Sequence, residues 1–485
     1  MPDLSAKQRL LNDLESSNIA EARNDLLEFI LETRPDFTNV NFHHEITCER
    51  LSRLRHEKGQ RLIITMPPQY SKSEMVSRCL PAWILGHNPK SKIILASYAS
   101  ALAESFNKDC QTIMEGEIYR RIFPRTLIRP HAPRKWARTG ALVETSSGGY
   151  LYAVGVGGAI TGKAANPLMI IDDPFKDWQE AMSPTRRQRV IDWYGSVIQT
   201  RLSLDANVVV MHTRWHEEDL VGHLIKQALE DSESSQYELI NFPALVEDKA
   251  ELHPHDPREI GEALWPKHKG DPRKLNQIKK DVGSFIFAAL FQQRPRSAQG
   301  NIVNPNWWRT YRVLPEKFDE LIMSVDCTFK DFDTSDYVVM QVWGRVGIEK
   351  YLIDQSRDHM DVIRTAREIA NLAVKYPRIY GIYIEDKANG AAVMQLLKRK
   401  VSRMIPIEPV GSKVSRVYAV SPQIEAGNVY IPHESVAKFD VGKFVQEFSN
   451  FPLAANDDQV DACTQALEQL SSGENHYLRE LLKKE

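Results

Sequence analysis

The chain has 485 residues, more than a single hydrophobic core usually serves, so two or three domains are expected. Its net charge is only −2, which excludes a protein that coats nucleic acid through a uniformly basic surface and leaves local basic patches for any DNA contact. The N-terminus is charged and no apolar run approaches about 18 residues, so neither a signal peptide nor a membrane span is expected.

The stretch RLIITMPPQYSKSEM, residues 61–75, has the order of a phosphate-binding loop. A β-branched apolar run predicts a strand, prolines follow it, and Lys72 and Ser73 stand at the start of a predicted helix. In such a loop, backbone amides and the lysine hold phosphate oxygens and the hydroxyl binds Mg²⁺. The usual glycines are replaced by Pro67 and Ser71, so a strand-loop-helix with an exposed lysine is an equal alternative on these residues alone. The residues expected at the nucleotide are Pro68, Gln69, Tyr70, Ser71, Lys72, Ser73 and Glu74.

Two acids end a predicted strand at residues 166–174, NPLMIIDDP, after a second strand at 92–97. The continuous apolar run is typical of a central parallel strand. Its C-terminal end is where an α/β nucleotide-binding fold needs a Mg²⁺ ligand and a water-activating acid, so Asp172 is predicted to take the first role and Asp173 the second. The alternative is a simple Asp-Pro turn, which the upstream loop makes less favoured.

A further strand at residues 207–212 runs into Thr213 and Arg214. A polar residue at this place can sense the γ-phosphate of a nucleotide, and a helix cap is an equal alternative for Thr213. The predicted helix at 41–54 carries His43 and His44, which are expected to be solvated, with contact to a nucleotide base as the less favoured alternative.

The predicted domain boundaries follow the change in composition after residue 245. Irregular loops and a helix at 274–291 form a lid-like region at 245–292, which closes a first domain at residues 1–292. Residues 293–318 are predicted to be a linker, residues 319–470 a second domain, and residues 471–485 a charged tail.

The second domain has the element order of a ribonuclease-H-like fold, with strands at 320–327, 336–343 and 350–355 and then a helix at 360–376. In this fold, three groups of acids converge: those at the end of the first strand, at the end of a fourth strand at 380–385 and at the start of the last helix. At the end of the fourth strand, Glu385 is preferred to Asp386 as the site residue. Converging carboxylates repel unless a divalent cation neutralises them. The predicted metal ligands are Asp326, Glu385, Asp457, Asp458 and Asp461. The nearby loop GSKVSR, residues 411–416, is the best candidate for contact with DNA phosphates.

Six segments of the chain resemble the large terminase subunit of tailed bacteriophages. These segments are PPQYSKSE (67–74), GVGGAITGKAANPLMIIDDP (155–174), HTRWHEEDL (212–220), SVDCTFKDFDTSDY (324–337), IEDKANG (384–390) and NDDQVDA (456–462). The resemblance implies an α/β protein with an N-terminal P-loop ATPase domain of the additional-strand (ASCE) type and a C-terminal ribonuclease-H-like nuclease domain. It further implies ATP, Mg²⁺ or Mn²⁺, double-stranded DNA, a small terminase subunit and a portal protein as cofactors and partners. The chain would act as a ring, usually of five copies, be a monomer when isolated, and work in the cytoplasm of the infected bacterium without joining the mature virion.

The resemblance also assigns residue roles. Lys72, Asp172 and Asp173 match the catalytic positions of the ATPase, Thr213 matches its coupling motif, and Lys163 stands where an inter-subunit basic finger is sought. The matching catalytic acids of the nuclease are Asp326, Glu385 and Asp458. Because the loop lacks a basic residue and a glycine of its relatives, an assembly protein with a degenerate ATPase is the first alternative, and a free-standing DNA repair nuclease is the second.

Overall fold

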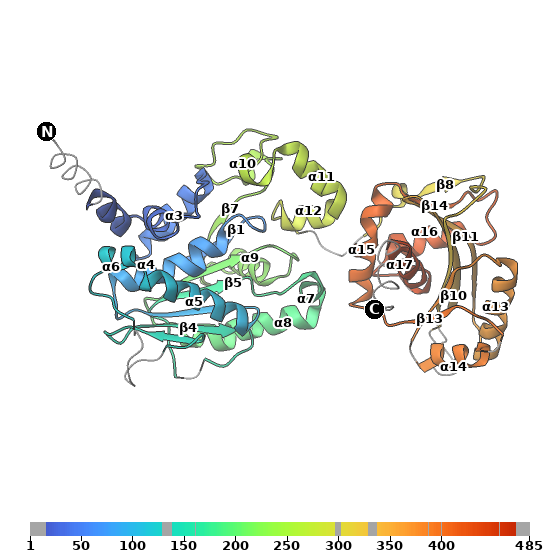
Figure 1. Ribbon diagram of the computed structural model, residues 1–485, viewed down its shortest axis with the longest axis horizontal. Coiled ribbons are helices and arrows are strands. Elements are labelled where there is room, and N and C mark those ends of the chain that lie inside the picture. The colour runs from blue at the N-terminus through green and yellow to red at the C-terminus, as the bar shows by residue number, and fades with distance from the viewer. Residues whose placement is uncertain are drawn as a thin grey trace, which may run out of the picture. The chain divides into compact units, whose positions relative to one another are not determined.

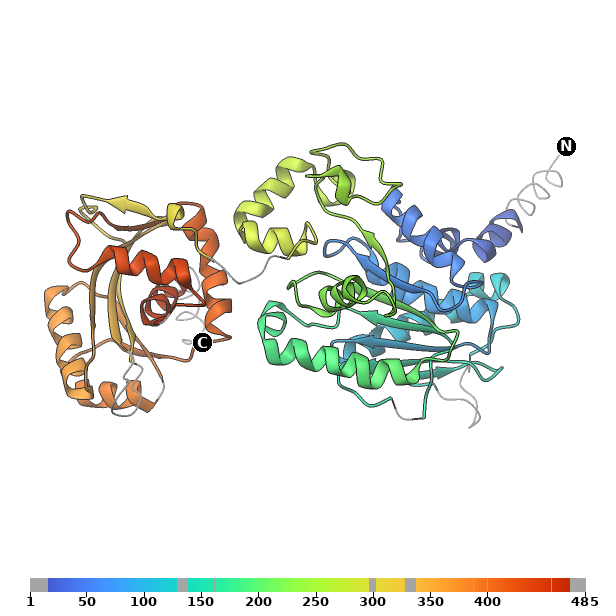
Figure 2. The same cartoon turned by 180° about the vertical axis from the view of Figure 1, so that it is seen from behind.

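The computed structural model describes residues 16–128, 138–160, 162–295, 302–327, 337–386, 388–398, 400–454 and 456–471. It divides the chain into two compact units, Met1–Lys279 with Phe285–Arg296, and Lys280–Ser284 with Ser297–Glu485. Each unit is built on a seven-stranded sheet with helices packed on its faces (Figures 1 and 2).

The sheet of the first unit has the strand order β3-β4-β2-β5-β6-β1-β7, and all neighbours except β3 and β4 are parallel. Its strands are β1 (Arg61–Thr65), β2 (Lys92–Ser97), β3 (Leu142–Glu144), β4 (Tyr150–Gly155), β5 (Pro167–Asp172), β6 (Asn207–His212) and β7 (Glu238–Asn241). Strand β6 lies between β1, which leads into the phosphate loop, and β5, which ends in the two acids. This additional strand confirms the predicted ATPase topology.

Alternation along the buried strands supplies apolar side chains to both faces of this sheet. Leu62 and Ile64 of β1 pack into one core cluster, and Ile63 between them packs into the other. The helices of the first face are α2 (Leu26–Thr33), α3 (Phe42–Arg53), α4 (Leu80–His87), α5 (Ser100–Glu115) and α6 (Glu117–Ile122). The second face is covered by α7 (Trp178–Met182), α8 (Pro184–Trp193) and α9 (Leu220–Glu230). Because both faces are covered, the polar loops at the strand ends are left to form the site.

The lid-like region contains the short helices α10 (Pro266–Lys269), α11 (Pro272–Val282) and α12 (Ser284–Leu290). The helix begins at Lys72 as predicted, widens into a π-helix, η1 (Glu74–Cys79), and continues into α4. Widened turns of this kind are common next to functional sites.

The second unit has the strand order β13-β12-β9-β10-β11-β14-β8, with antiparallel pairing only on either side of β10. Its strands are β8 (Arg309–Tyr311), β9 (Glu320–Asp326), β10 (Val338–Val346), β11 (Glu349–Asp358), β12 (Gly381–Glu385), β13 (Met404–Ile407) and β14 (Val429–Pro432). Its helices are α13 (Val362–Lys375), α14 (Ala388–Leu397), α15 (Lys413–Glu425), α16 (Val441–Asn450) and α17 (Asp458–Ser471). The three-strand, helix, strand order confirms the ribonuclease-H-like prediction.

The predicted linker needs a correction, because Arg309–Tyr311 forms the edge strand β8 paired with β14. Three residues are too few to carry a period-two pattern, so no sequence signal marks this strand. Of the predicted tail at 471–485, all residues after 471 lie outside the described part of the chain. Among the helices that are described, none is both long and apolar enough to cross a membrane.

Candidate functional site

The loop after β1 has two residues in the left-handed conformation that favours glycine, and one of them, Ser71, replaces a glycine of the usual loop. Gln69 and Ser71 have φ angles of 63° and 65°, in the left-handed region that costs a non-glycine residue roughly 1–2 kcal/mol. The amide of Met75 then donates to the Ser71 carbonyl over 3.2 Å as the helix begins. The loop therefore curls as a phosphate loop does, at the expense of backbone strain.

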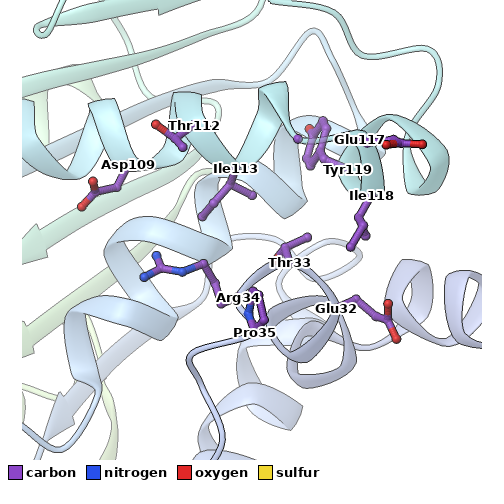
Figure 3. A pocket seen from close by; sticks show the side chains of 11 residues that line it. Glu32, Thr33, Arg34, Pro35, Asp109, Thr112, Ile113, Glu117, Ile118 and Tyr119 are labelled. Carbon is purple, nitrogen blue, oxygen red and sulfur yellow. The ribbon is translucent and has the colours of Figure 1, made fainter.

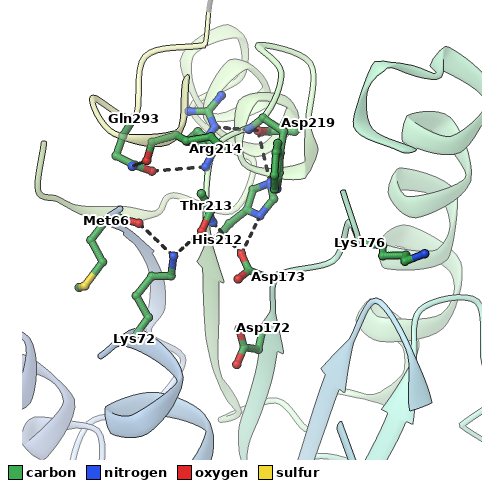
Figure 4. A network of polar contacts seen from close by, with 12 residues as sticks. Met66, Lys72, Asp172, Asp173, Lys176, His212, Thr213, Arg214, Asp219 and Gln293 are labelled. Atoms are coloured by element: carbon green, nitrogen blue, oxygen red, sulfur yellow. Dashed lines mark hydrogen bonds and ion pairs between the residues drawn. The ribbon is translucent and has the colours of Figure 1, made fainter. Parts of the chain in front are cut away.

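Lys72 is buried under this loop rather than exposed at a helix start. Its Nζ donates to the Met66 carbonyl over 3.0 Å and to Thr213 Oγ1 on the neighbouring strand end (Figure 4). Burial lowers the pKa of Lys72, and the Asp173 and Asp172 carboxylates oppose that shift. A buried cation held between two strand ends and facing carboxylates is well placed to receive phosphate oxygens.

Asp172 ends β5 and is buried behind the loop. Ser77 Oγ donates to its Oδ2 over 2.6 Å, and Ser73 also hydrogen-bonds to it. Burial, and then the neighbouring Asp173 carboxylate, raises the pKa of Asp172. Hard oxygen donors on Ser73 and Asp172 lie together next to the phosphate loop, so the donor set fits Mg²⁺.

Asp173 follows β5 with a φ of 42° and points toward the end of β6. Its Oδ1 accepts a hydrogen bond from the Thr213 amide over 2.7 Å and lies 3.4 Å from Nδ1 of His212. Burial would raise the pKa of Asp173, but the Lys72 ammonium and His212 lower it below its usual value. Its place beside Lys72 and Thr213 at the strand end, rather than this pKa shift, suits the water-activating role.

A cavity of about 640 Å³ opens over the loop. Of the residues predicted to contact the nucleotide, those that line it are Pro68, Gln69, Ser71, Lys72, Ser73, Glu74 and Thr213. Asp173 lines it as well, together with residues that sequence reasoning missed, namely Asp36, Phe37, Arg78, Trp215, His268 and Lys269. Lys269 reaches the loop from the lid-like region, where its Nζ donates to Gln69 Oε1 over 2.9 Å. A separation of 200 residues left no local signal for this contact.

Two predicted nucleotide contacts lie elsewhere. Tyr70 is buried in the core, where its ring packs 6.0 Å from both His43 and Trp265. His43 and His44 share that core, which corrects the expectation of a solvated pair. Lys163 lies over the Tyr150 ring, 3.9 Å from Glu144, and does not line the cavity of its own chain.

A second cavity of about 630 Å³ lies between α2, α5 and α6 (Figure 3). Two residues that line it, Arg34 and Asp109, are joined by ion pairs to Glu74 and Arg78, which line the loop cavity. The Arg34–Glu74 distance is 2.6 Å, so the predicted nucleotide contact Glu74 is already held by a cation.

Acidic residues of the second unit gather at one strand edge. Asp326 ends β9 and Glu385 ends β12, and the parallel register sets Ile384 opposite Val325, so the two acids are neighbours. The α17 carbonyl of Ala462 accepts from Ser324 Oγ over 2.7 Å, which fixes this helix against β9. A small cavity is lined by Asp326, Glu385, Ile407, Pro409, Arg416, Asp461, Gln465 and Glu468.

The predicted metal ligands are only partly assembled. Asp461 lines the cavity, whereas Asp457 and Asp458 do not, and the exposed Asp386 lies outside it. Both oxygens of Asp461 face cations, with Arg416 Nη2 at 2.6 Å and Lys413 Nζ at 2.7 Å. Within the described residues, no group of three or more His, Cys, Asp or Glu side chains is arranged to hold a metal ion.

The carboxylates that line this cavity still suit Mg²⁺ or Mn²⁺ once the two cations move, because they offer hard oxygen donors. One of them, Glu468, lies two turns beyond Asp461 on α17 and was missed by sequence reasoning. No motif in the sequence singles it out, since it lies outside the acidic start of the helix.

The two units define a protein class in which an additional-strand nucleoside triphosphatase fold is joined to a ribonuclease-H-like nuclease fold. The family model "Terminase large subunit, T4likevirus-type, N-terminal" matches residues 63–275, and the model "Terminase RNaseH-like domain" matches residues 323–470. The chain belongs to the terminase large-subunit family, the DNA-packaging motors that carry a nuclease domain.

Three solved structures are similar to this chain at low sequence identity. A large terminase from a thermophilic bacteriophage is 11% identical, with a TM-score of 0.48, over 87% of this chain and 98% of that one. The HK97 bacteriophage large terminase is 11% identical, with a TM-score of 0.34, over 89% and 95%. The large terminase nuclease from thermophilic phage G20c with bound magnesium is 14% identical, with a TM-score of 0.28, over 36% and 99%. No curated protein matches the chain.

Proposed function

We propose that the first unit hydrolyses ATP to drive DNA translocation and that the second unit cuts the DNA with two metal ions. The observation that carries the ATPase proposal is the contact of Lys72 with Thr213 beside Asp173, at the C-terminal edge of the sheet. Lys72 would bind the outer phosphates, and Asp173 would take a proton from the attacking water. Thr213 contacts both residues, and through them it would sense whether the γ-phosphate is bound.

Ser73 and Asp172 would hold Mg²⁺ in the ATPase site, directly or through water. When bound, the cation neutralises charge on the phosphates. The Lys269 ammonium at the mouth of the cavity adds a second positive charge from the lid-like region, which offsets the missing basic residue of the loop. This contact favours an active ATPase over an assembly protein with a degenerate site.

The nuclease proposal rests on Asp326, Glu385 and Asp461 around one cavity, with Asp457, Asp458 and Glu468 as further acids on or next to α17. Bound Mg²⁺ or Mn²⁺ would activate water and stabilise the leaving oxygen. Lys413 and Arg416 would hold a DNA phosphate once they leave Asp461.

Family membership further supports double-stranded DNA, a small terminase subunit and a portal protein as partners. It also supports a ring of five copies working in the cytoplasm of the infected bacterium. Because Lys163 does not line the cavity of its own chain, its proposed role is to reach the nucleotide of a neighbouring copy.

Two variants of the full chain test the two activities separately. With Mg²⁺, the wild type is expected to hydrolyse ATP, and Lys72→Ala is expected to lose this turnover. With Mn²⁺, the wild type is expected to cleave plasmid DNA, and Asp326→Ala is expected to lose this cleavage. Equal ATP turnover in the wild type and Lys72→Ala would refute the ATPase, and cleavage that survives in Asp326→Ala would refute the nuclease site.

A further inference from the structure

His212, the last residue of β6, lies between two carboxylates in the interior of the first unit (Figure 4). Its Nδ1 is 3.4 Å from Asp173 Oδ1, and its Nε2 is 3.3 Å from Asp219 Oδ2. The imidazole and the Asp219 side chain are both fully buried. The contact at Nδ1 has hydrogen-bond geometry and the contact at Nε2 is an ion-pair distance only, so the buried ring faces one acid at each nitrogen.

The contact with Asp173 falls on a single oxygen. Oδ1 faces His212 and also accepts the Thr213 amide at 2.7 Å, so two groups of β6 and its following loop fix it. Asp173 lines the loop cavity, which leaves the second carboxylate oxygen as the one to meet a water molecule there. The backbone is pinned too, since the Asp173 amide donates to the Met211 carbonyl over 2.9 Å.

Asp219 is fixed independently of His212. Its carboxylate accepts from Arg214 Nε at 2.9 Å and 3.0 Å, and its Oδ1 accepts the Gly222 amide at 2.9 Å as the N-cap of α9. The side chains of Asp173, His212, Asp219 and Arg214 therefore contact one another in that order. Burial lowers the pKa of His212, but Asp219 and Asp173 raise it, and the net shift is above its usual value.

We propose that His212 and Asp219 are positioning residues that orient the Asp173 carboxylate toward the attacking water during ATP hydrolysis, which rests on the ATPase function proposed above. His212 takes no part in proton transfer. It holds Oδ1 of Asp173, and Asp219 holds His212. Without the pair, the carboxylate retains one hydrogen bond to the Thr213 amide and can rotate about its side-chain torsions, which lowers the fraction of bound ATP that faces an aligned base.

A double-mutant cycle of ATP hydrolysis by the full chain with Mg²⁺ tests this role. His212→Asn is expected to lower kcat about 10- to 100-fold, as for a misaligned catalytic group, and to leave the Kd of ATP within about threefold. In an Asp173→Asn background, the same change is expected to lower kcat by less than about twofold, because no base remains to be aligned. Asp219→Asn keeps the cap of α9, since Asn also caps helices, and is expected to lower kcat in the same direction.

His216→Asn is the matched control, because His216 is buried in the loop that follows β6 but its Nδ1 accepts from the Glu218 amide instead of facing a carboxylate. This variant should retain wild-type kcat. Wild-type kcat in His212→Asn or Asp219→Asn, or an equal fold loss from His212→Asn with and without Asp173, would overturn the positioning role. If the wild-type chain shows no ATP turnover that is lost in Lys72→Ala, the ATPase function itself is overturned.

Discussion

At the scale of single residues, Gln69 and Ser71 hold left-handed conformations in the phosphate loop without being glycine. Such a conformation costs a residue with a Cβ roughly 1–2 kcal/mol, and the buried Lys72 and Tyr70 keep the loop in place against that cost. The strain identifies a position at which a smaller residue should help folding.

Ser71→Gly is expected to raise the free energy of unfolding by about 0.5–1 kcal/mol, because relief of the left-handed strain exceeds the extra entropy of glycine in the unfolded chain. Ser71→Val should lower it, since a β-branched residue resists a positive φ. Denaturant unfolding of the full chain measures both. A decrease in Ser71→Gly would mean that the serine side chain stabilises the loop more than its φ destabilises it.

His43 and His44 form a second residue-scale feature, since burial in an aromatic core keeps both rings neutral. Burial, and then the neighbouring His44, lowers the pKa of His43 to about 2, and burial lowers that of His44 to about 3. The folded-state pKa values lie below the unfolded ones, so only the unfolded chain takes up these protons as the pH falls below about 6.5. Their contribution to stability is thus complete above about pH 6.5 and is lost below it.

His43→Gln should therefore flatten the decline of unfolding free energy with acid, by up to about 1.4 kcal/mol for each pH unit below about 6.5. Urea unfolding at a series of pH values from about 5 to about 7, on both sides of the ordinary histidine pKa, measures this slope. His56→Gln is the control, since His56 is exposed. Equal slopes for wild type and His43→Gln would show that His43 is charged in the fold.

At the scale of elements, α15 and α17 face each other through an ion-pair cluster at the predicted metal site. Lys413 Nζ lies 2.7 Å from both Asp457 Oδ1 and Asp461 Oδ2, and Arg416 holds the other oxygen of Asp461. Cations on one helix thus neutralise the acids that a metal would neutralise. A divalent cation must displace at least part of this cluster to bind Asp461.

Lys413→Met is expected to tighten Mn²⁺ binding roughly three- to tenfold, because a half-exposed competing charge is worth about 1 kcal/mol. The same variant should weaken binding of plasmid DNA, since a phosphate contact is lost. Calorimetric titration of Mn²⁺ and a DNA-binding assay measure the two effects. Lys398→Met, at an exposed position after α14, should change neither. Unchanged or weaker Mn²⁺ binding in Lys413→Met would contradict competition at Asp461.

The elements that can be predicted from the sequence are the long or strongly patterned strands. The apolar run of β5 and the order of β9, β10 and β11 are visible because buried strands need continuous apolar residues. The strands β7, β13 and β14 have only four residues each, too few to show a period. The site residues at the ends of these strands could be predicted because the strands themselves could be. The places of Lys269 and Asp219 in the site depend on tertiary packing, which no local sequence pattern encodes.

At the scale of the whole molecule, the chain consists of two compact units, each with its own sheet and core. The predicted nucleotide ligands all belong to the first unit, and the predicted nuclease acids all belong to the second. A ligand that binds only the folded form of one unit stabilises that unit by mass action, by about 2.7 kcal/mol at about 100 times its Kd. The two ligands should therefore act on different unfolding transitions.

Calorimetric unfolding of the full chain is expected to show two transitions, of which a non-hydrolysable ATP analogue with Mg²⁺ raises the Tm of one and Mn²⁺ alone raises the Tm of the other. Lys72→Ala should abolish only the first shift, because it removes the buried phosphate ligand, and Asp326→Ala only the second, because it removes a metal ligand. The variants serve as controls for each other, since each leaves the opposite unit intact. A single transition that both ligands raise would contradict independent units, and loss of both shifts in either variant would show that the two sites are energetically coupled.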